Sequence, residues 1–164
     1  MEQPSDFSSY LEEVAARSAA PGGGSVAAVV AAFAAALTEM AARYAEEEET
    51  AARAGALRAR FLELATEDAE AYGAVLGAQG EERQRALSQA ADVPLELAES
   101  AVEVSELASR LAAEGNPSLR GDAMTASLLA MAAAKAAANL VEINLEARPE
   151  DERIARARAL AKAF

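Results

Sequence analysis

The chain has 164 residues, a net charge of −12, and neither cysteine nor histidine. The absence of cysteine excludes disulfide bonds, thiolate metal sites and a cysteine nucleophile. The absence of histidine removes the side chain that most often acts as a general base near neutral pH and that most often binds metals. Any acid–base chemistry therefore falls to Asp, Glu, Lys or Tyr, and we expect no metal site.

The length predicts one domain over residues 1–164. Hydrophobic residues make up 52% of the chain, but there are only four Phe, three Tyr and no Trp. Alanine dominates, and it favours helices whose backbones approach closely. With 27 acidic against 15 basic residues, nucleic acid is not an expected partner, and a site for an anionic ligand must supply local positive potential.

The apolar segment near the N-terminus is too short to indicate a membrane partner. The apolar run from Val26 to Leu37 is shorter than the ~20 residues needed to span a bilayer. No basic segment precedes a long apolar one at the N-terminus, so we expect a cytoplasmic protein.

The first two expected helices flank a glycine stretch. Four apolar residues at helical spacing mark the first helix: Phe7, Tyr10, Leu11 and Val14. It should end near Ser18, before Pro21 and three glycines. A second helix is expected to begin near Ser25, a favourable N-cap, and to run to the glutamates at 46–49, which should lie in solvent.

A third helix is expected from about Thr50 to Gly77. Its apolar stripe contains Leu57, Phe61, Leu64, Tyr72 and Val75. After a connection at Gly80 the chain is again helical from Glu81, and Pro94 either kinks this helix or begins a new one in its first turn. The stripe that follows Pro94 ends at the GNPS segment, 115–118.

The next expected helix, near Leu119 to Ala147, carries a single charged residue, Lys135, between Ala123 and Val141. A last amphipathic helix follows Pro149. Its apolar residues are Ile154, Ala157, Leu160 and Phe164. No strand-like alternation occurs, so the predicted fold is all-α, a multihelical antiparallel bundle with one or two long buried apolar helices.

Two segments, Val26–Leu37 and Ala123–Val141, are apolar enough to require burial on every side. One bundle of this length can fully surround about one helix. We therefore expect the second segment to pack against another subunit in a two-fold homodimer.

The glycine stretch at 22–24 could let a ligand approach the backbone at the start of a helix, where free N–H groups favour anions. A tight turn between helices explains it equally well. Asp68 lies four residues after Leu64 and four before Tyr72, on a core stripe where an apolar residue is expected. Burial of its charge requires a satisfied network or a functional use, unless it caps a helix or pairs with an arginine.

Asp122 is placed to cap the apolar helix or to meet a ligand at its start. Lys135 and Asn139 share one face of that helix, whereas Asn144 lies on the Asp122 side but about 33 Å further along. These residues cannot all serve one site within a chain. Lys135 could have a lowered pKa, pair with a carboxylate such as Asp68, or extend from an interface edge.

Several motifs occur in an order that resembles a known family. They are PGGGS at 21–25, Met40 near the end of an alanine-rich helix, DAEAY at 68–72, VP at 93–94, GN at 115–116 before Asp122, and NLVEIN at 139–144. The chain resembles the cyclodeaminase family, found as the C-terminal domain of formiminotransferase-cyclodeaminase and as stand-alone bacterial proteins often called methenyltetrahydrofolate cyclohydrolases.

The resemblance implies a helical homodimer that acts on one-carbon units of tetrahydrofolate. Its reactions are the conversion of 5-formiminotetrahydrofolate to 5,10-methenyltetrahydrofolate and ammonia, and the interconversion of the methenyl and 10-formyl forms. The substrate is then a folate, no cofactor is tightly bound, and a separate formiminotransferase is a possible partner. Asp68 and Asp122 would be the acid and base. The implied folate-binding residues are Pro21, Gly22, Gly23, Gly24, Ser25, Asn116, Lys135, Asn139 and Asn144.

Three positions depart from the family pattern. Ser118 stands where an asparagine is common, Gly121 where a serine is common, and Lys135 where a small residue is usual. The alternative interpretations are therefore a folate-binding or partner-binding module that lacks turnover, and a structural helical dimer.

Overall fold

The computed structural model describes residues 5–162, and every regular element within that range is helical. The α-helices are α1 (Ser5–Ala15), α2 (Gly23–Tyr44), α3 (Glu48–Gly77), α4 (Gly80–Ala90), α5 (Asp92–Glu114), α6 (Arg120–Asn144) and α7 (Glu152–Ala161), and a short 3-10 helix η1 (Pro117–Leu119) precedes α6. The all-helical prediction is therefore confirmed. Phe164 lies outside the described residues.

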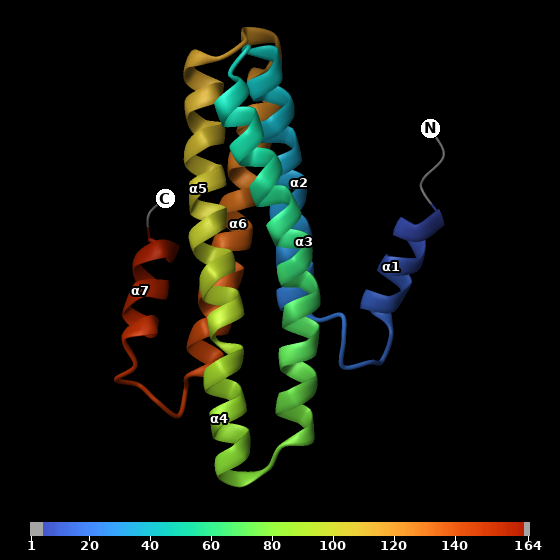
Figure 1. Cartoon of the computed structure of the whole chain (residues 1–164), viewed down its shortest axis with the longest axis vertical. Helices are drawn as coiled ribbons and strands as arrows, with labels where there is room; N and C mark the ends of the chain where they lie inside the picture. Colours follow the sequence, from blue (N-terminus) through green and yellow to red (C-terminus); the bar gives the residue numbers. More distant parts are fainter. Residues whose placement is uncertain (1–4, 163–164) are drawn as a thin grey trace.

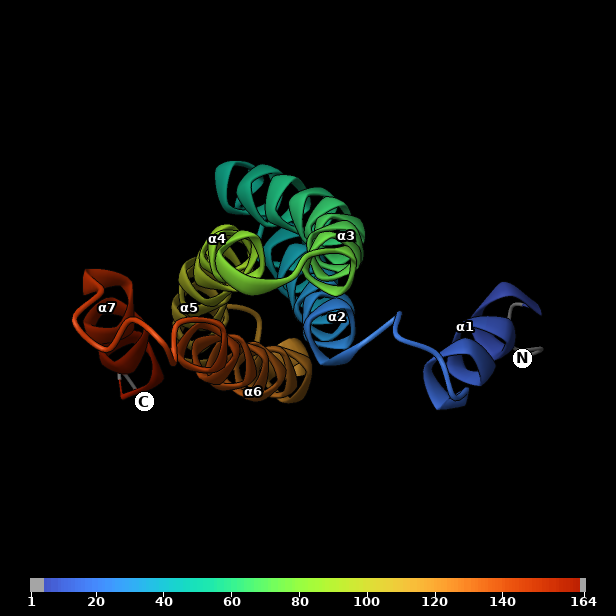
Figure 2. The same ribbon diagram turned by 90° about the horizontal axis from the view of Figure 1, so that it is seen from below.

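Helices α2, α3, α5 and α6 form a long bundle (Figure 1). The turn between α2 and α3 and the connection between α5 and α6 lie together at the upper end of the view, whereas α3 and α4 join at the lower end. Seen from below, α1 lies off the bundle on the α2 side and α7 lies on the opposite side, against α5 and α6 (Figure 2). Residues at the start of α2 are therefore far from those at the start of α6.

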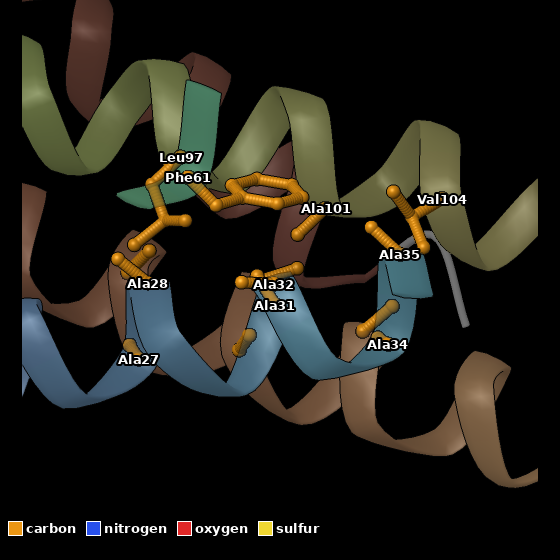
Figure 3. Close-up of a cluster of buried hydrophobic side chains, with 14 of the residues drawn as sticks. Ala27, Ala28, Ala31, Ala32, Ala34, Ala35, Phe61, Leu97, Ala101 and Val104 are labelled. Carbon is orange, nitrogen blue, oxygen red and sulfur yellow. The ribbon is translucent and has the colours of Figure 1, made fainter. Parts of the chain in front are cut away.

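The core consists of alanine faces packed around a few large side chains. On α2, Ala28, Ala31 and Ala35 are fully buried, and Phe61 of α3 lies against this face together with Leu97 of α5 (Figure 3). Because alanine leaves little bulk between backbones, α2 can contact α3, α5 and α6 at once. Most of segment 26–37 therefore lies inside the bundle, but Phe33 is 49% exposed, so the predicted burial of this segment on every side is not achieved within one chain.

Several details of the predicted elements differ in the structure. Helix α1 ends at Ala15 and not near Ser18. Helix α2 begins at Gly23 with Gly22 as its N-cap, so Ser25 lies inside the first turn and is not the cap. Tyr72 does not lie in the core: its relative exposure is 45%, because the lower half of α3 extends past the start of α2. Pro94 does not kink a continuous helix. It lies in the first turn of a separate helix, α5, which was one of the two predicted alternatives.

Helix α6 is buried on one face only. Ala126, Ala130, Ala137 and Val141 face the bundle, whereas Leu128 and Ile143 are 62% and 56% exposed. By length and composition alone, α2 and the segment Pro117–Asn144 could each cross a membrane, a property shared by core helices of soluble proteins. Within one chain, then, the predicted burial of segment 123–141 on every side is not achieved.

Candidate functional site

A pocket of about 270 Å³ lies at the start of α2, between α2, α3 and the end of α6. Its walls come from the linker before α2, the lower half of α3 and the last turns of α6. The lining residues are Ala19, Ala20, Gly22, Gly23, Gly24, Asp68, Ala69, Ala71, Tyr72, Ala90, Leu140, Ile143 and Asn144. The tertiary structure therefore brings together the glycine stretch, Asp68 and Asn144, which the sequence analysis selected separately.

Asp68 is the one acidic residue in this lining. Its carboxylate accepts a hydrogen bond from the buried Ser25 hydroxyl, with 3.0 Å between Oγ and Oδ2. The same hydroxyl lies 3.0 Å from the Ala65 carbonyl oxygen. Asp68 is partly buried, and among residues 5–162 no arginine forms an ion pair with it. Ser25 thus acts on the pocket through Asp68, and not as a cap of α2.

Gly24 is required by the close approach of Asp68 to α2. A Cβ atom built on Gly24 would lie 2.0 Å from Oδ1 of Asp68 and 2.4 Å from its Cγ. A Cβ on Gly23, in contrast, would meet nothing within 4 Å. Of the glycines at 22–24, the one at position 24 therefore makes room for the carboxylate.

The start of α2 supplies positive potential to the pocket. The N–H groups of a first helical turn have no partner within the helix, and the helix dipole places its positive end there. Gly22 and Gly23 add no side chains that would cover these groups. This end of α2 favours a negative charge on a bound ligand, in a protein whose net charge is otherwise strongly negative.

Asn144 fixes the opposite wall. Its Nδ2 donates a hydrogen bond to the Ala90 carbonyl oxygen at 3.1 Å, which ties the end of α6 to the junction of α4 and α5. Leu140 and Ile143 give this wall an apolar surface. An apolar wall that faces a carboxylate and helix N–H groups suits a flat ligand with polar edges.

The other predicted site residues lie elsewhere in the chain. Asp122 is in the first turn of α6, at the far end from Asn144, about 33 Å away by helical rise. Asn116 lies at that same end, where its Nδ2 donates to the Tyr44 carbonyl oxygen at 3.3 Å and its Oδ1 accepts from the Ser118 N–H. Their roles in ligand binding or catalysis remain predictions.

Lys135 and Asn139 are exposed on α6, outside the pocket. Pro21 precedes the glycines but does not line the pocket. Within residues 5–162, the structure contains no group of three acidic side chains arranged to hold a metal ion.

Tyr10 is a neighbour of the site that the sequence analysis assigned only to an apolar stripe. Its hydroxyl oxygen is buried and has no hydrogen-bond partner in the described part of the chain. Burial, followed by the charges of Asp68 and Glu13, raises the pKa of Tyr10 above its usual value. The position of Tyr10 on α1 gave no signal of this proximity, because only the path of the linker between α1 and α2 decides it.

The sequence matches the formiminotransferase-cyclodeaminase family over residues 6–163. The structure is similar to the crystal structure of formiminotetrahydrofolate cyclodeaminase from Thermotoga maritima, with a TM-score of 0.87 and 28% sequence identity, over 95% of this chain and 89% of that chain. No curated protein matches the chain. Because the family match covers almost the whole sequence, this chain belongs to the formiminotransferase-cyclodeaminase family.

Proposed function

We propose that the protein is an enzyme of folate one-carbon metabolism, a formiminotetrahydrofolate cyclodeaminase or a methenyltetrahydrofolate cyclohydrolase. The observation that carries this proposal is the Asp68 carboxylate held against the start of α2 in a pocket, in a chain of this family. The structural similarity to the Thermotoga maritima formiminotetrahydrofolate cyclodeaminase supports the cyclodeaminase activity.

The proposed reaction needs proton transfers that a carboxylate can perform. In the cyclodeaminase reaction, N10 attacks the carbon of the protonated formimino group on N5, which gives a tetrahedral carbon that carries an NH2 group. N10 then loses its proton, the exocyclic nitrogen gains one, and the bond to that nitrogen breaks to release ammonia and the methenyl cation. Asp68 is the pocket's candidate for carrying the proton between the two nitrogens, since Tyr72 is the only other titratable residue in the lining.

The pocket volume of about 270 Å³ is just below the usual range of ligand pockets, which is ~300–1,000 Å³. We infer that it receives the bicyclic pterin and the reacting carbon, with the remainder of the folate outside. Folate enters as the substrate, and no tightly bound cofactor is part of the proposal. The apolar surface of Leu140 and Ile143 suits one face of the pterin ring.

A homodimer is part of the same proposal, because α6 leaves Leu128 and Ile143 exposed on a face nearly free of charge. If two copies of α6 pack antiparallel about an axis through their midpoints, near residue 132, Asp122 of the partner subunit comes level with residue 142 of the first. It would then lie beside Asn144 and the pocket. In one chain, Asp68 and Asp122 are at opposite ends of the bundle.

The protein would act in the cytoplasm, where folate one-carbon units are exchanged between soluble enzymes. A formiminotransferase is the class of partner that would supply the formimino substrate. Neither a nucleic acid nor a membrane is a proposed partner.

Turnover of methenyltetrahydrofolate, followed by its absorbance, tests the proposal. We expect wild-type protein and the control Asp92→Asn, whose side chain is 68% exposed and is not part of the pocket lining, to be active. Asp68→Asn and Asp122→Asn should each lose at least a hundredfold in kcat. Full activity in both variants would refute the assignment of the two carboxylates.

Titration with 5-formyltetrahydrofolate by calorimetry separates the alternative functions. Binding without turnover in the wild-type protein would support a folate-binding module. No heat and no thermal stabilisation would contradict any folate site.

A further inference from the structure

The Tyr10 hydroxyl is the unexplained polar group nearest to the site. It is buried, yet no donor or acceptor within residues 5–162 pairs with it. A buried polar group without a partner costs about 1–3 kcal/mol, so such groups are rare unless another state of the protein satisfies them. This group therefore points to a partner that forms in the working state of the site.

The packing of α1 directs Tyr10 towards Asp68. Phe7 contacts Phe33 of α2 edge-on, with 5.9 Å between ring centroids. Tyr10 follows Phe7 by one turn and so lies on the same side of α1. Helix α1 runs down to the linker and α2 runs up from it (Figure 1). Tyr10 is therefore nearer than Phe7 to the start of α2, where Asp68 lies against Gly24.

Asp68 has an oxygen available for such a donor. Its Oδ2 accepts from Ser25, whereas no hydrogen bond to Oδ1 is formed among the described residues. The charged or titratable groups that face Tyr10 are Asp68 from α3 and Glu13 on α1. Both disfavour the phenolate, so Tyr10 is a neutral donor at physiological pH.

We propose that Tyr10 is a positioning residue for Asp68: a small movement of α1 towards the start of α2 lets its hydroxyl donate a hydrogen bond to Oδ1 of the Asp68 carboxylate. Ser25 and Tyr10 then hold one carboxylate oxygen each, and the orientation of the proton-transfer group is fixed from both sides. This inference rests on the proposed function for its effect on turnover, but the pairing of Tyr10 with Asp68 does not.

The pairing is tested without any activity. In a Tyr44→Phe/Tyr72→Phe background, Tyr10 is the only tyrosine, and its ring carbon bonded to the hydroxyl can be labelled with carbon-13 and titrated by NMR. We expect a midpoint above 10.0 that falls when Asp68→Asn is added, because a negative charge is removed. An unchanged midpoint in Asp68→Asn would overturn the proposal.

The effect on turnover is the second measurement. Tyr10→Phe should lower kcat about tenfold and change KM by less than about threefold, because a positioned carboxylate acts mainly in the transition state. Tyr44→Phe is the matched control, since it removes one hydroxyl from an exposed ring at the far end of the bundle. An equal kcat in Tyr10→Phe and wild type would contradict the positioning role. If the wild type shows no turnover, the proposed function fails, whereas the NMR titration still decides the pairing.

Discussion

Gly24 and Asp68 lie so close that an alanine side chain at position 24 would occupy the space of the Asp68 carboxylate, with its Cβ 2.0 Å from Oδ1. The contact joins the start of α2 to the middle of α3 and determines where the carboxylate lies. It also explains why position 24 of the glycine stretch is a glycine: a larger residue would collide with an acidic side chain.

We expect Gly24→Ala to remain folded and to lose activity. The obstructing atoms belong to the end of a flexible side chain, so Asp68 can turn away without moving either backbone. The lost hydrogen bond from Ser25 should reduce turnover at least tenfold, while alanine's higher helix propensity offsets much of the cost to stability. Enzyme assays and chemical denaturation measure the two effects.

The matched variant is Gly23→Ala, where the added Cβ meets nothing within 4 Å. It should raise the free energy of unfolding by about 0.5–1 kcal/mol. A loss of stability in Gly23→Ala, or wild-type turnover in Gly24→Ala, would contradict this account of the glycines.

The hydrogen bond between Ser25 and Asp68 should appear as an energetic coupling. In a double-mutant cycle with Ser25→Ala and Asp68→Asn, we expect a coupling of about 1–2 kcal/mol in the free energy of unfolding, because the hydroxyl is buried and its acceptor is charged. A parallel cycle of Ser25→Ala with Asp122→Asn should give a coupling near zero. Equal couplings in both cycles would show that the effect is not specific to this pair.

The proposed antiparallel dimer predicts complementation between two inactive variants. A heterodimer of Asp68→Asn and Asp122→Asn subunits contains one pocket with both carboxylates intact and one with neither. Random mixing makes half of the dimers mixed, so the activity should recover to about a quarter of the wild-type value. Activity that stays at the level of the single variants after subunit exchange would rule out a site shared between subunits.

Acid should weaken the far end of the bundle through Glu47. The Arg110 guanidinium donates two hydrogen bonds to Glu47, at 2.9 and 2.6 Å, and Thr50 donates a third. These bonds lower the pKa of Glu47 from 4.5 to about 2. The stabilisation is therefore complete above the unfolded-state pKa and is lost as the pH falls towards about 2.

The measurement is the free energy of unfolding of Glu47→Gln and wild type as a function of pH. After allowance for solvent screening, the wild type should be more stable by about 1 kcal/mol at neutral pH, and the difference should disappear near the pKa of about 2. Glu49→Gln, an exposed neighbour in the same helical turn, should show a smaller dependence. A difference that persists at the lowest pH would mean that the charge of Glu47 is not its cause.

The alanine core should reject larger side chains. Ala31 is fully buried in the cluster that contains Phe61, and Ala31→Leu should reduce the free energy of unfolding by about 1–3 kcal/mol through overpacking. Ala52→Leu, at an exposed position of α3, should change it by less than about 0.5 kcal/mol. Thermal denaturation of both variants tests whether close packing of α2 holds the bundle together.

The sequence determined the helices and the chemical character of the chain. Apolar spacing predicted α3 closely. The helix was expected to begin near Thr50 and begins at Glu48, and it ends at Gly77 as expected. The absence of histidine and cysteine restricted the chemistry to carboxylates, lysine or tyrosine, and the motifs from PGGGS to NLVEIN indicated the family.

Only the tertiary structure decided which of the selected residues meet. Gly24, Asp68 and Asn144 belong to three helices and come together because the start of α2, the middle of α3 and the end of α6 lie at one level of the bundle. Asp122, selected on equal grounds, lies at the other end. Tyr10 is near enough to feel the charge of Asp68 only because of the path of the linker between α1 and α2. Periodicity reports the face of a helix on which a residue lies, but contacts between helices depend on how the whole bundle packs.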